Sequence, residues 1–125
     1  MADDKSNILI VDDSQDKLLV LGSILEELDQ NLVFARSGEE ALRKVLESEF
    51  AVILLDVYMP GLDGLDTMRE LRKNPRLKSL PIIAVTAKAM KGDREKCIEA
   101  GAWDYLSKPV DAEQMLAVLR AWLHR

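Results

Sequence analysis

The stretch that decides the fold is AVILLDVYMPGLDG, residues 51–64. Residues 51–55 form an unbroken apolar run that is long enough for a β-strand and too short to span a membrane. Because the run does not alternate with polar residues, it predicts a strand covered by helices on both faces, as in a parallel sheet. The run stops at Asp56, and turn-forming residues follow it. The stretch therefore places one carboxylate where a central strand leaves the core.

Asp56 has two interpretations, a functional carboxylate or the cap of the following helix. In open α/β sheets the carboxyl ends of the strands are where ligands bind, which favours a function. Asp63 is the better candidate for the cap, because Leu65, Met68 and Leu71 recur behind it at helical spacing. We therefore interpret Asp56 as functional.

The composition sets limits on the class of protein. A chain of 125 residues predicts one domain, residues 1–125, without a separate effector domain. Its 17 basic and 22 acidic residues give a net charge of -5, which argues against direct binding of nucleic acid or of an anionic membrane. The sequence shows neither an apolar segment of spanning length nor a signal-peptide pattern, so we expect no membrane insertion. The single cysteine, Cys97, cannot form an internal disulfide and fits a cytoplasmic location.

Strands and helices alternate along the whole chain. Helix starts are predicted at Ser14, at Ser37 (a capping box with Glu40), at Asp63, at residue 91 and at Asp111. Strands are predicted at residues 7–11, 32–35, 51–55, 81–85 and 103–107. The pattern predicts a single doubly wound (βα)5 domain, an α/β fold whose five-stranded parallel sheet has the order 2-1-3-4-5.

Polar side chains stand where four of these strands end. Asp12 and Asp13 follow the first strand, Asp56 ends the third, Thr86 ends the fourth and Lys108 follows the fifth. In this strand order the first and third strands are neighbours, so the three carboxylates should converge. Carboxylates that close repel one another unless a cation joins them, and oxygen ligands suit Mg²⁺. A metal, a lysine and a hydroxyl around one carboxylate predict a phosphoryl group on Asp56, with the acid as nucleophile.

Four motifs resemble the receiver domain of two-component response regulators, the CheY-like family. They are VDDS at 11–14, LLDVYMPGLDG at 54–64, AVTAKAMKGD at 84–93 and YLSKPVD at 105–111. The resemblance covers about residues 5–123, with the motifs in order and at compatible spacings.

The resemblance implies a role for each matching residue. Asp56 matches the phosphoacceptor. Asp13, Asp56 and the main-chain carbonyl of Tyr58 match the Mg²⁺ ligands, and Asp12 matches the acid that acts mainly through water.

The remaining matches concern the phosphoryl group and the switch. Lys108 matches the lysine that binds the phosphoryl group, Thr86 the switch hydroxyl, and Tyr105 the aromatic residue that changes rotamer when Thr86 moves. The resemblance also implies a cis peptide bond before Pro109, which would aim Lys108 back at Asp56.

The family implies a signalling switch more than an enzyme that acts on an external substrate. Its phosphodonor is a phosphohistidine on a histidine kinase or a histidine phosphotransfer protein, and receivers catalyse their own phosphorylation and dephosphorylation. We expect the signal to be read on a face formed by the fourth helix, fifth strand and fifth helix, with Trp103 and Tyr105 on it. Alternatively, Trp103 only covers the apolar end of the fourth helix.

The first helix carries more apolar residues than one core face needs. Leu19, Val20 and Ile24 widen its apolar face, and they either help to dock the phosphodonor or are buried between neighbouring helices.

Three other functions compete with a phosphorylated receiver. A flavodoxin-like flavin protein would need a phosphate loop where this chain has Asp12 and Asp13, which would repel the phosphate. A phosphatase of the haloacid-dehalogenase type would need a second acid at Tyr58. The more serious alternative is a degenerate receiver that serves only as a phosphorylation-independent protein-binding scaffold, although every chemical position is intact.

Overall fold

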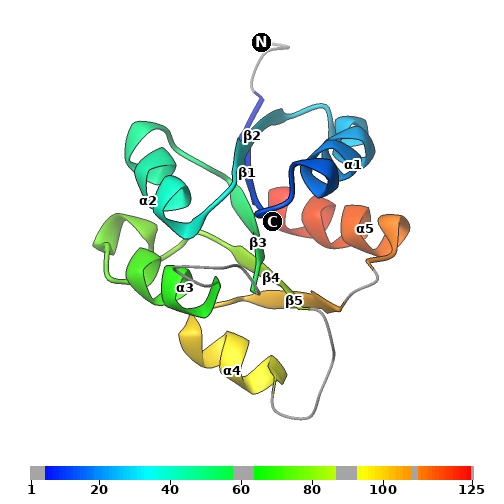
Figure 1. Cartoon of the computed structure of the whole chain (residues 1–125). Coiled ribbons are helices and arrows are strands. Elements are labelled where there is room, and N and C mark those ends of the chain that lie inside the picture. The colour runs from blue at the N-terminus through cyan, green and yellow to red at the C-terminus, as the bar shows by residue number, and fades with distance from the viewer. Residues whose placement is uncertain (1–4, 58–63, 87–92, 108–109, 125) are drawn as a thin grey trace.

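The computed structural model describes residues 5–57, 64–86, 93–107 and 110–124, and in these ranges strands and helices alternate (Figure 1). The strands are β1 (Asn7–Val11), β2 (Asn31–Ala35), β3 (Val52–Asp56), β4 (Ile82–Thr86) and β5 (Asp104–Ser107). The helices are α1 (Gln15–Leu25), α2 (Gly38–Glu47), α3 (Gly64–Arg72), α4 (Asp93–Ala100) and α5 (Ala112–Leu123). Two short 3-10 turns, Glu26–Leu28 and Pro75–Leu77, were not expected from the sequence.

The five strands form one parallel sheet in the order β2-β1-β3-β4-β5, as predicted. The strand that carries Asp56, β3, is central, with β1 on one side and β4 on the other. All of its residues are buried, which explains its unbroken apolar run.

Successive residues of the inner strands point to opposite faces of the sheet and form two separate cores. Leu9, Ile53 and Leu55 pack with α2, α3 and α4 on one face. Ile10 and Leu54 pack with α1 and α5 on the other face. Figure 1 shows these two layers of helices on either side of the sheet. The two cores hold the sheet rigid from both faces, so the ends of its strands keep fixed positions.

Side-chain oxygens cap the first helices as expected. The hydroxyl of Ser14 accepts a hydrogen bond from the N–H of Lys17, and that of Ser37 accepts one from the N–H of Glu40. The predicted capping box is only half correct, because the Glu40 carboxylate accepts from the N–H of Arg36 and not of Ser37. Both caps supply acceptors to first-turn N–H groups that have no partner inside the helix.

Several element boundaries differ from the prediction. β3 covers Val52–Asp56 where residues 51–55 were predicted, and Asp56 is its last residue, as expected. β5 begins at Asp104, which leaves Trp103 just outside the strand, although the Trp103 N–H still donates to the carbonyl of Ile82. The expected helix cap at Asp63 lies outside the described residues.

Arg72, the last residue of α3, fastens three segments together. Its Nε and Nη2 atoms donate to the carbonyl of Gly101 at 3.0 and 2.7 Å, and Nη1 donates to the carbonyl of Leu77 at 2.6 Å. The guanidinium carbon lies 5.4 Å from the ring centroid of Trp103, which also lies 5.5 Å from the ring of Trp122 in α5. Partial burial lowers the pKa of Arg72. The ends of α3 and α4 and the start of β5 are therefore fixed to one another.

Among residues 5–57, 64–86, 93–107 and 110–124, no helix is long and apolar enough to cross a membrane.

Candidate functional site

Three neighbouring strands deliver polar side chains to one edge of the sheet. Asp12 comes directly after β1, Asp56 is the last residue of β3, and Thr86 is the last residue of β4. The register pairs Val11 with Leu55 and Asp56 with Val85, so these strands end almost level with one another. The parallel sheet therefore gathers residues that are more than 70 positions apart, from 12 to 86, at its carboxyl edge.

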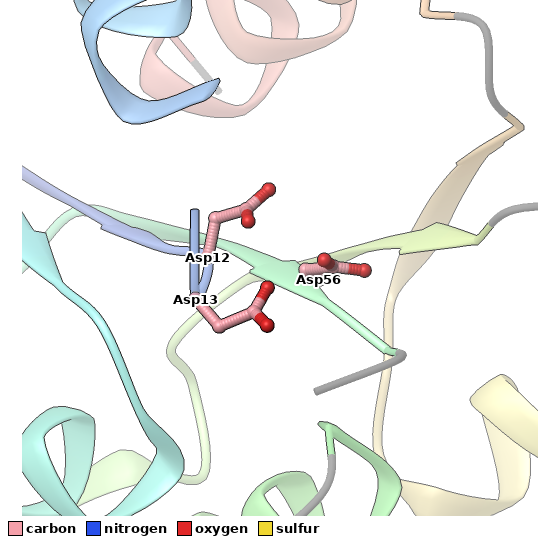
Figure 2. A group of neighbouring side chains, drawn as sticks. All are labelled: Asp12, Asp13 and Asp56. Carbon is pink, nitrogen blue, oxygen red and sulfur yellow. The ribbon is translucent and has the colours of Figure 1, made fainter. Parts of the chain in front are cut away.

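The three aspartates meet at this edge (Figure 2). One carboxylate oxygen from each of Asp12, Asp13 and Asp56 lies within 4.8 Å of the other two. Asp56 and Asp12 are 2% and 3% exposed, and Asp13 is half-buried. The predicted convergence of the three carboxylates is thus confirmed.

Backbone hydrogen bonds fix the positions of these acids. The N–H of Ser14 donates to Oδ1 of Asp12 at 2.9 Å, and the N–H of Asp12 donates to the carbonyl of Ala35 at 3.1 Å. Arg36 Nη2 donates to the carbonyl of Asp13 at 3.4 Å. The sequence did not indicate this role for Arg36, because a carbonyl partner leaves no signature in the residue types. Asp12 and Asp13 are therefore held by their own turn and by the residues at the end of β2, before any ligand binds.

The chemistry of this donor set fits a hard divalent cation. Three carboxylates, two of them buried, repel one another at these distances, and a cation between them would relieve that repulsion. Mg²⁺ prefers oxygen ligands and usually takes only one or two carboxylates, keeping several waters. The acids that could hold Mg²⁺ are therefore among Asp12, Asp13 and Asp56.

Gly64, the first residue of α3, lies directly against the end of β3. Its N–H donates to the carbonyl of Val57 at 2.9 Å. A Cβ atom added to Gly64 would lie 2.4 Å from the Cα of Val57 and 2.5 Å from the carbonyl oxygen of Asp56. Only glycine allows this contact, so α3 starts in direct contact with the backbone of Asp56. Nothing in the residue types around Gly64 indicates this contact.

The other residues of the predicted site are divided between described and undescribed parts of the chain. Thr86 is 1% exposed at the same edge as Asp56, and Tyr105 is half-buried against the core under α2, α3 and α4. Lys108, its bond to Pro109, and the carbonyl of Tyr58 lie outside the described residues.

The family model of the response regulator receiver domain matches residues 8–120. The chain belongs to this family. As a receiver domain it is 36% identical over 118 residues to protein PilH of Pseudomonas aeruginosa, and the match covers 94% of this chain and 98% of PilH. It is also 36% identical over 108 residues to the signal transduction histidine-protein kinase BarA of Escherichia coli. That match covers 86% of this receiver but only 12% of the kinase, so the chain spans a small part of such relatives.

Solved receiver structures share this fold. The receiver domain of a sensor histidine kinase from Pseudomonas aeruginosa superposes with a TM-score of 0.88 at 34% identity, covering 97% of this chain and 99% of that one. That structure holds a magnesium ion coordinated in its active-site cleft. The chemotaxis protein CheY4 of Vibrio cholerae gives a TM-score of 0.89 at 28% identity, covering 95% and 99% of the two chains.

We expect Asp13→Ala to weaken Mg²⁺ binding to this receiver by more than about tenfold, since even the loss of an outer partner of a metal ligand costs about 10–100-fold in affinity. Titration with Mg²⁺ by calorimetry or by amide chemical shifts would measure the change. Asp16→Ala is the matched control. Asp16 is exposed on the first turn of α1, and its substitution removes the same charge outside the triad. Equal affinities for the Asp13→Ala variant and the unmodified protein would remove Asp13 from the ligand set.

Proposed function

We propose that this receiver is a phosphorylation-dependent switch in which Asp56 accepts a phosphoryl group from a phosphohistidine in the presence of Mg²⁺. The observation that carries the proposal is the position of Asp56. It ends the central strand at the carboxyl edge of the sheet, within 4.8 Å of two further carboxylates that suit a cation. Membership of the receiver family and the magnesium ion in a relative's cleft support the same chemistry.

The transfer replaces one bond to phosphorus by another. A carboxylate oxygen of Asp56 attacks the phosphorus, the phosphorus–nitrogen bond to the donor histidine breaks, and the imidazole leaves with the bonding electrons. Mg²⁺, when bound, offsets negative charge on the phosphoryl oxygens. We assign the Lys108 ammonium and the Thr86 hydroxyl to those same oxygens. Attack of water on phosphorus later returns Asp56 and inorganic phosphate, so the protein acts as a phosphoacceptor that resets itself.

The decisive test is incubation with Mg²⁺ and acetyl phosphate, followed by intact-mass measurement. A phosphorylatable receiver gains the mass of one phosphoryl group, and removal of Mg²⁺ with a chelator prevents the gain. A scaffold that binds partners independently of phosphorylation shows no gain under either condition. The absence of a phosphoryl adduct with Mg²⁺ present would therefore refute the proposal.

The exposed apolar residues of α1 support a docking site for the phosphodonor. Leu19 and Val20 are 66% and 59% exposed, whereas Ile24 is half-buried. The alternative that all three residues are simply buried is therefore wrong. Helix α1 begins at the same edge as Asp12 and Asp13, so a donor helix packed over Leu19 and Val20 would be close to Asp56.

We expect the double variant Leu19→Gln with Val20→Gln to slow phosphotransfer from its histidine-containing donor by about tenfold or more, because contacts of exposed apolar anchors are lost. The rate with acetyl phosphate should be unchanged, because that donor needs no docking surface. Leu46→Gln is the control: Leu46 is 69% exposed, but it lies in the last turn of α2, away from the edge where the helices begin. Equal effects on both donors would rule out docking by this pair.

For the output, we propose the face formed by α4, β5 and α5, with Trp103 and Tyr105 as part of it. β5 is the edge strand next to β4, and the register places Tyr105 opposite Ala84, two residues before Thr86. A Thr86 hydroxyl drawn toward the phosphoryl group would leave space for Tyr105 to turn inward. Trp103, 36% exposed, contacts Arg72 of α3 and Trp122 of α5, which supports a role beyond covering the end of α4.

In a Trp122→Phe background, we expect the fluorescence of Trp103 to change when beryllofluoride and Mg²⁺ imitate the phosphorylated state. The reason is that Trp103 is two residues from Tyr105 and its ring is held in place by Arg72. The emission spectrum measures the change, and the same addition to an Asp56→Asn variant should give none. An unchanged spectrum on activation would leave Trp103 out of the response. If Trp103→Ala also keeps every partner interaction, Trp103 is not part of the face.

The proposal extends to the setting in which the domain works. We propose that residues 1–125 act as one receiver domain in the cytoplasm, phosphorylated by a histidine kinase or a histidine phosphotransfer protein. Relatives of this receiver include PilH, which it matches over nearly the full length, and kinases of which it covers 12%. Transfer assays with purified phosphorylated kinase domains and phosphotransfer proteins would identify the donor by its rate.

A further inference from the structure

A cavity of about 360 Å³ lies between α1, α5 and the sheet, and it reaches the phosphoacceptor. Its volume is within the range of small-molecule sites. Leu21 and Ile24 of α1, Leu54 and Val85 of the sheet, and Met115 of α5 form apolar walls. Within the described parts of the chain, the charged residues of the lining are Asp12, Asp16, Lys17 and Asp56.

The charges of the lining are unequal. Among the lining residues that the structure describes, three carboxylates and one ammonium give a formal excess of two negative charges. The two inner carboxylates, Asp12 and Asp56, are buried, at 3% and 2% exposed, whereas Asp16 and Lys17 are exposed. Water screens the outer pair, so the inner carboxylates determine the potential inside the cavity. An apolar chamber lined by two buried acids is complementary to a ligand with an apolar body and a cationic head.

We propose that this cavity is a binding site for a small amphiphilic organic cation, such as an arylalkyl amine. The ammonium group lies against Asp12 and Asp56, and the aromatic body lies between α1 and α5. Burial of the apolar body and the charge-assisted contact of its head act together in a site with little water. Binding needs no phosphoryl group, so the inference goes beyond the proposed switch.

Because the cavity shares Asp12 and Asp56 with the carboxylate triad, the amine and Mg²⁺ compete. Each ligand weakens the binding of the other, as thermodynamic linkage requires. An amphiphilic amine would therefore act as a negative regulator of phosphorylation.

The test uses 2-phenylethylamine, which is protonated at neutral pH, and the neutral 2-phenylethanol of nearly the same shape. Titration of the ¹⁵N-labelled protein in chelator-treated buffer gives each Kd from amide chemical shifts. We expect the alcohol to bind about tenfold or more weakly than the amine, because it has no positive charge to pair with the two carboxylates. Saturating Mg²⁺ should weaken the amine by about tenfold or more and leave the alcohol nearly unchanged.

Two substitutions fill the cavity. Ile24→Trp places a large ring inside it, and Val20→Trp does so at its exposed rim, where folding is less at risk. Both should weaken the amine by about tenfold or more. The matched control is Ser23→Trp, because Ser23 is exposed on the same helix but lines a separate groove beside Phe34. Circular dichroism confirms that each variant is folded.

Three results would overturn the inference. They are equal affinities for the amine and the alcohol, amine binding that Mg²⁺ does not alter, and equal effects of Val20→Trp and Ser23→Trp. The experiments distinguish a failure of the proposed cavity site from a failure of the proposed phosphorylation switch. The amine titration contains no phosphodonor, and the acetyl phosphate assay contains no amine.

Discussion

The variant Asp56→Asn is expected to form no stable phosphorylated species with Mg²⁺ and acetyl phosphate. Asparagine has nearly the shape of aspartate, but its amide is not a carboxylate nucleophile and cannot form an acyl phosphate. The fold should remain intact, because the substitution also removes one of three charges that lie within 4.8 Å of one another. In chelator-treated buffer its free energy of unfolding should equal or exceed that of the unmodified protein. Intact mass and urea denaturation provide the two measurements.

Asp16→Asn is the control for this experiment. It makes the same chemical change at an exposed aspartate of α1, and it should be phosphorylated at the normal rate. A stoichiometric phosphoryl group on the Asp56→Asn variant, gained with normal kinetics, would show that another residue is the nucleophile. Loss of the adduct together with loss of the fold would contradict the expected stability.

Gly64→Ala is expected to destabilise the protein by about 2 kcal/mol or more, as overpacking against a rigid neighbour does. Helix propensity alone predicts the opposite, since alanine is favoured over glycine in helices by about 1 kcal/mol. The added Cβ would meet backbone atoms of Asp56 and Val57 at 2.5 and 2.4 Å, and a buried central strand cannot easily move away. The same shift should displace Asp56, so phosphorylation by acetyl phosphate should slow by on the order of a hundredfold.

Gly22→Ala separates this contact from the general effect of the substitution. At Gly22, in the middle of α1, the nearest atom to an added Cβ is Cζ of Phe34 at 3.0 Å, the tip of a half-exposed side chain that can turn aside. The Gly22→Ala variant should therefore be as stable as the unmodified protein or up to about 1 kcal/mol more stable. Urea denaturation compares the two variants. A stable Gly64→Ala variant with a normal phosphorylation rate would show that the start of α3 does not constrain Asp56.

The sequence predicted the sheet and the acidic cluster because both depend on residue types at regular positions. Apolar runs locate buried strands to within about one residue, and the order of strands along the chain follows from the alternation with helices. For this reason β1 was predicted with the bounds that the structure has, and Asp12, Asp13 and Asp56 were expected to converge. The spacing of these three aspartates in the sequence does not by itself predict that they lie close together; the order of the strands does.

The features that the sequence did not predict depend on backbone partners or on packing. Arg72 donates to the carbonyls of Leu77 and Gly101, and every residue type offers the same carbonyl. Trp103 looked like a strand residue because aromatic residues favour strands, yet β5 begins one residue later. The contact of Gly64 with Asp56 could not be predicted, because glycine is also common in turns that need no such contact.

Because the residues of the site come from β1, β3 and β4, the site forms only when these strands are paired in the sheet. Asp12 and Asp13 come from the chain before α2, and Asp56 comes from the chain after it. A protein divided at the exposed Glu49 would carry Asp12 and Asp13 on one fragment and Asp56 with Thr86 on the other. The pairing of β1 with β3, which brings the acids together, would exist only in the reassembled pair. Formation of the acyl phosphate would then show that the two fragments have associated, and the divided receiver would serve as a chemical sensor of that association.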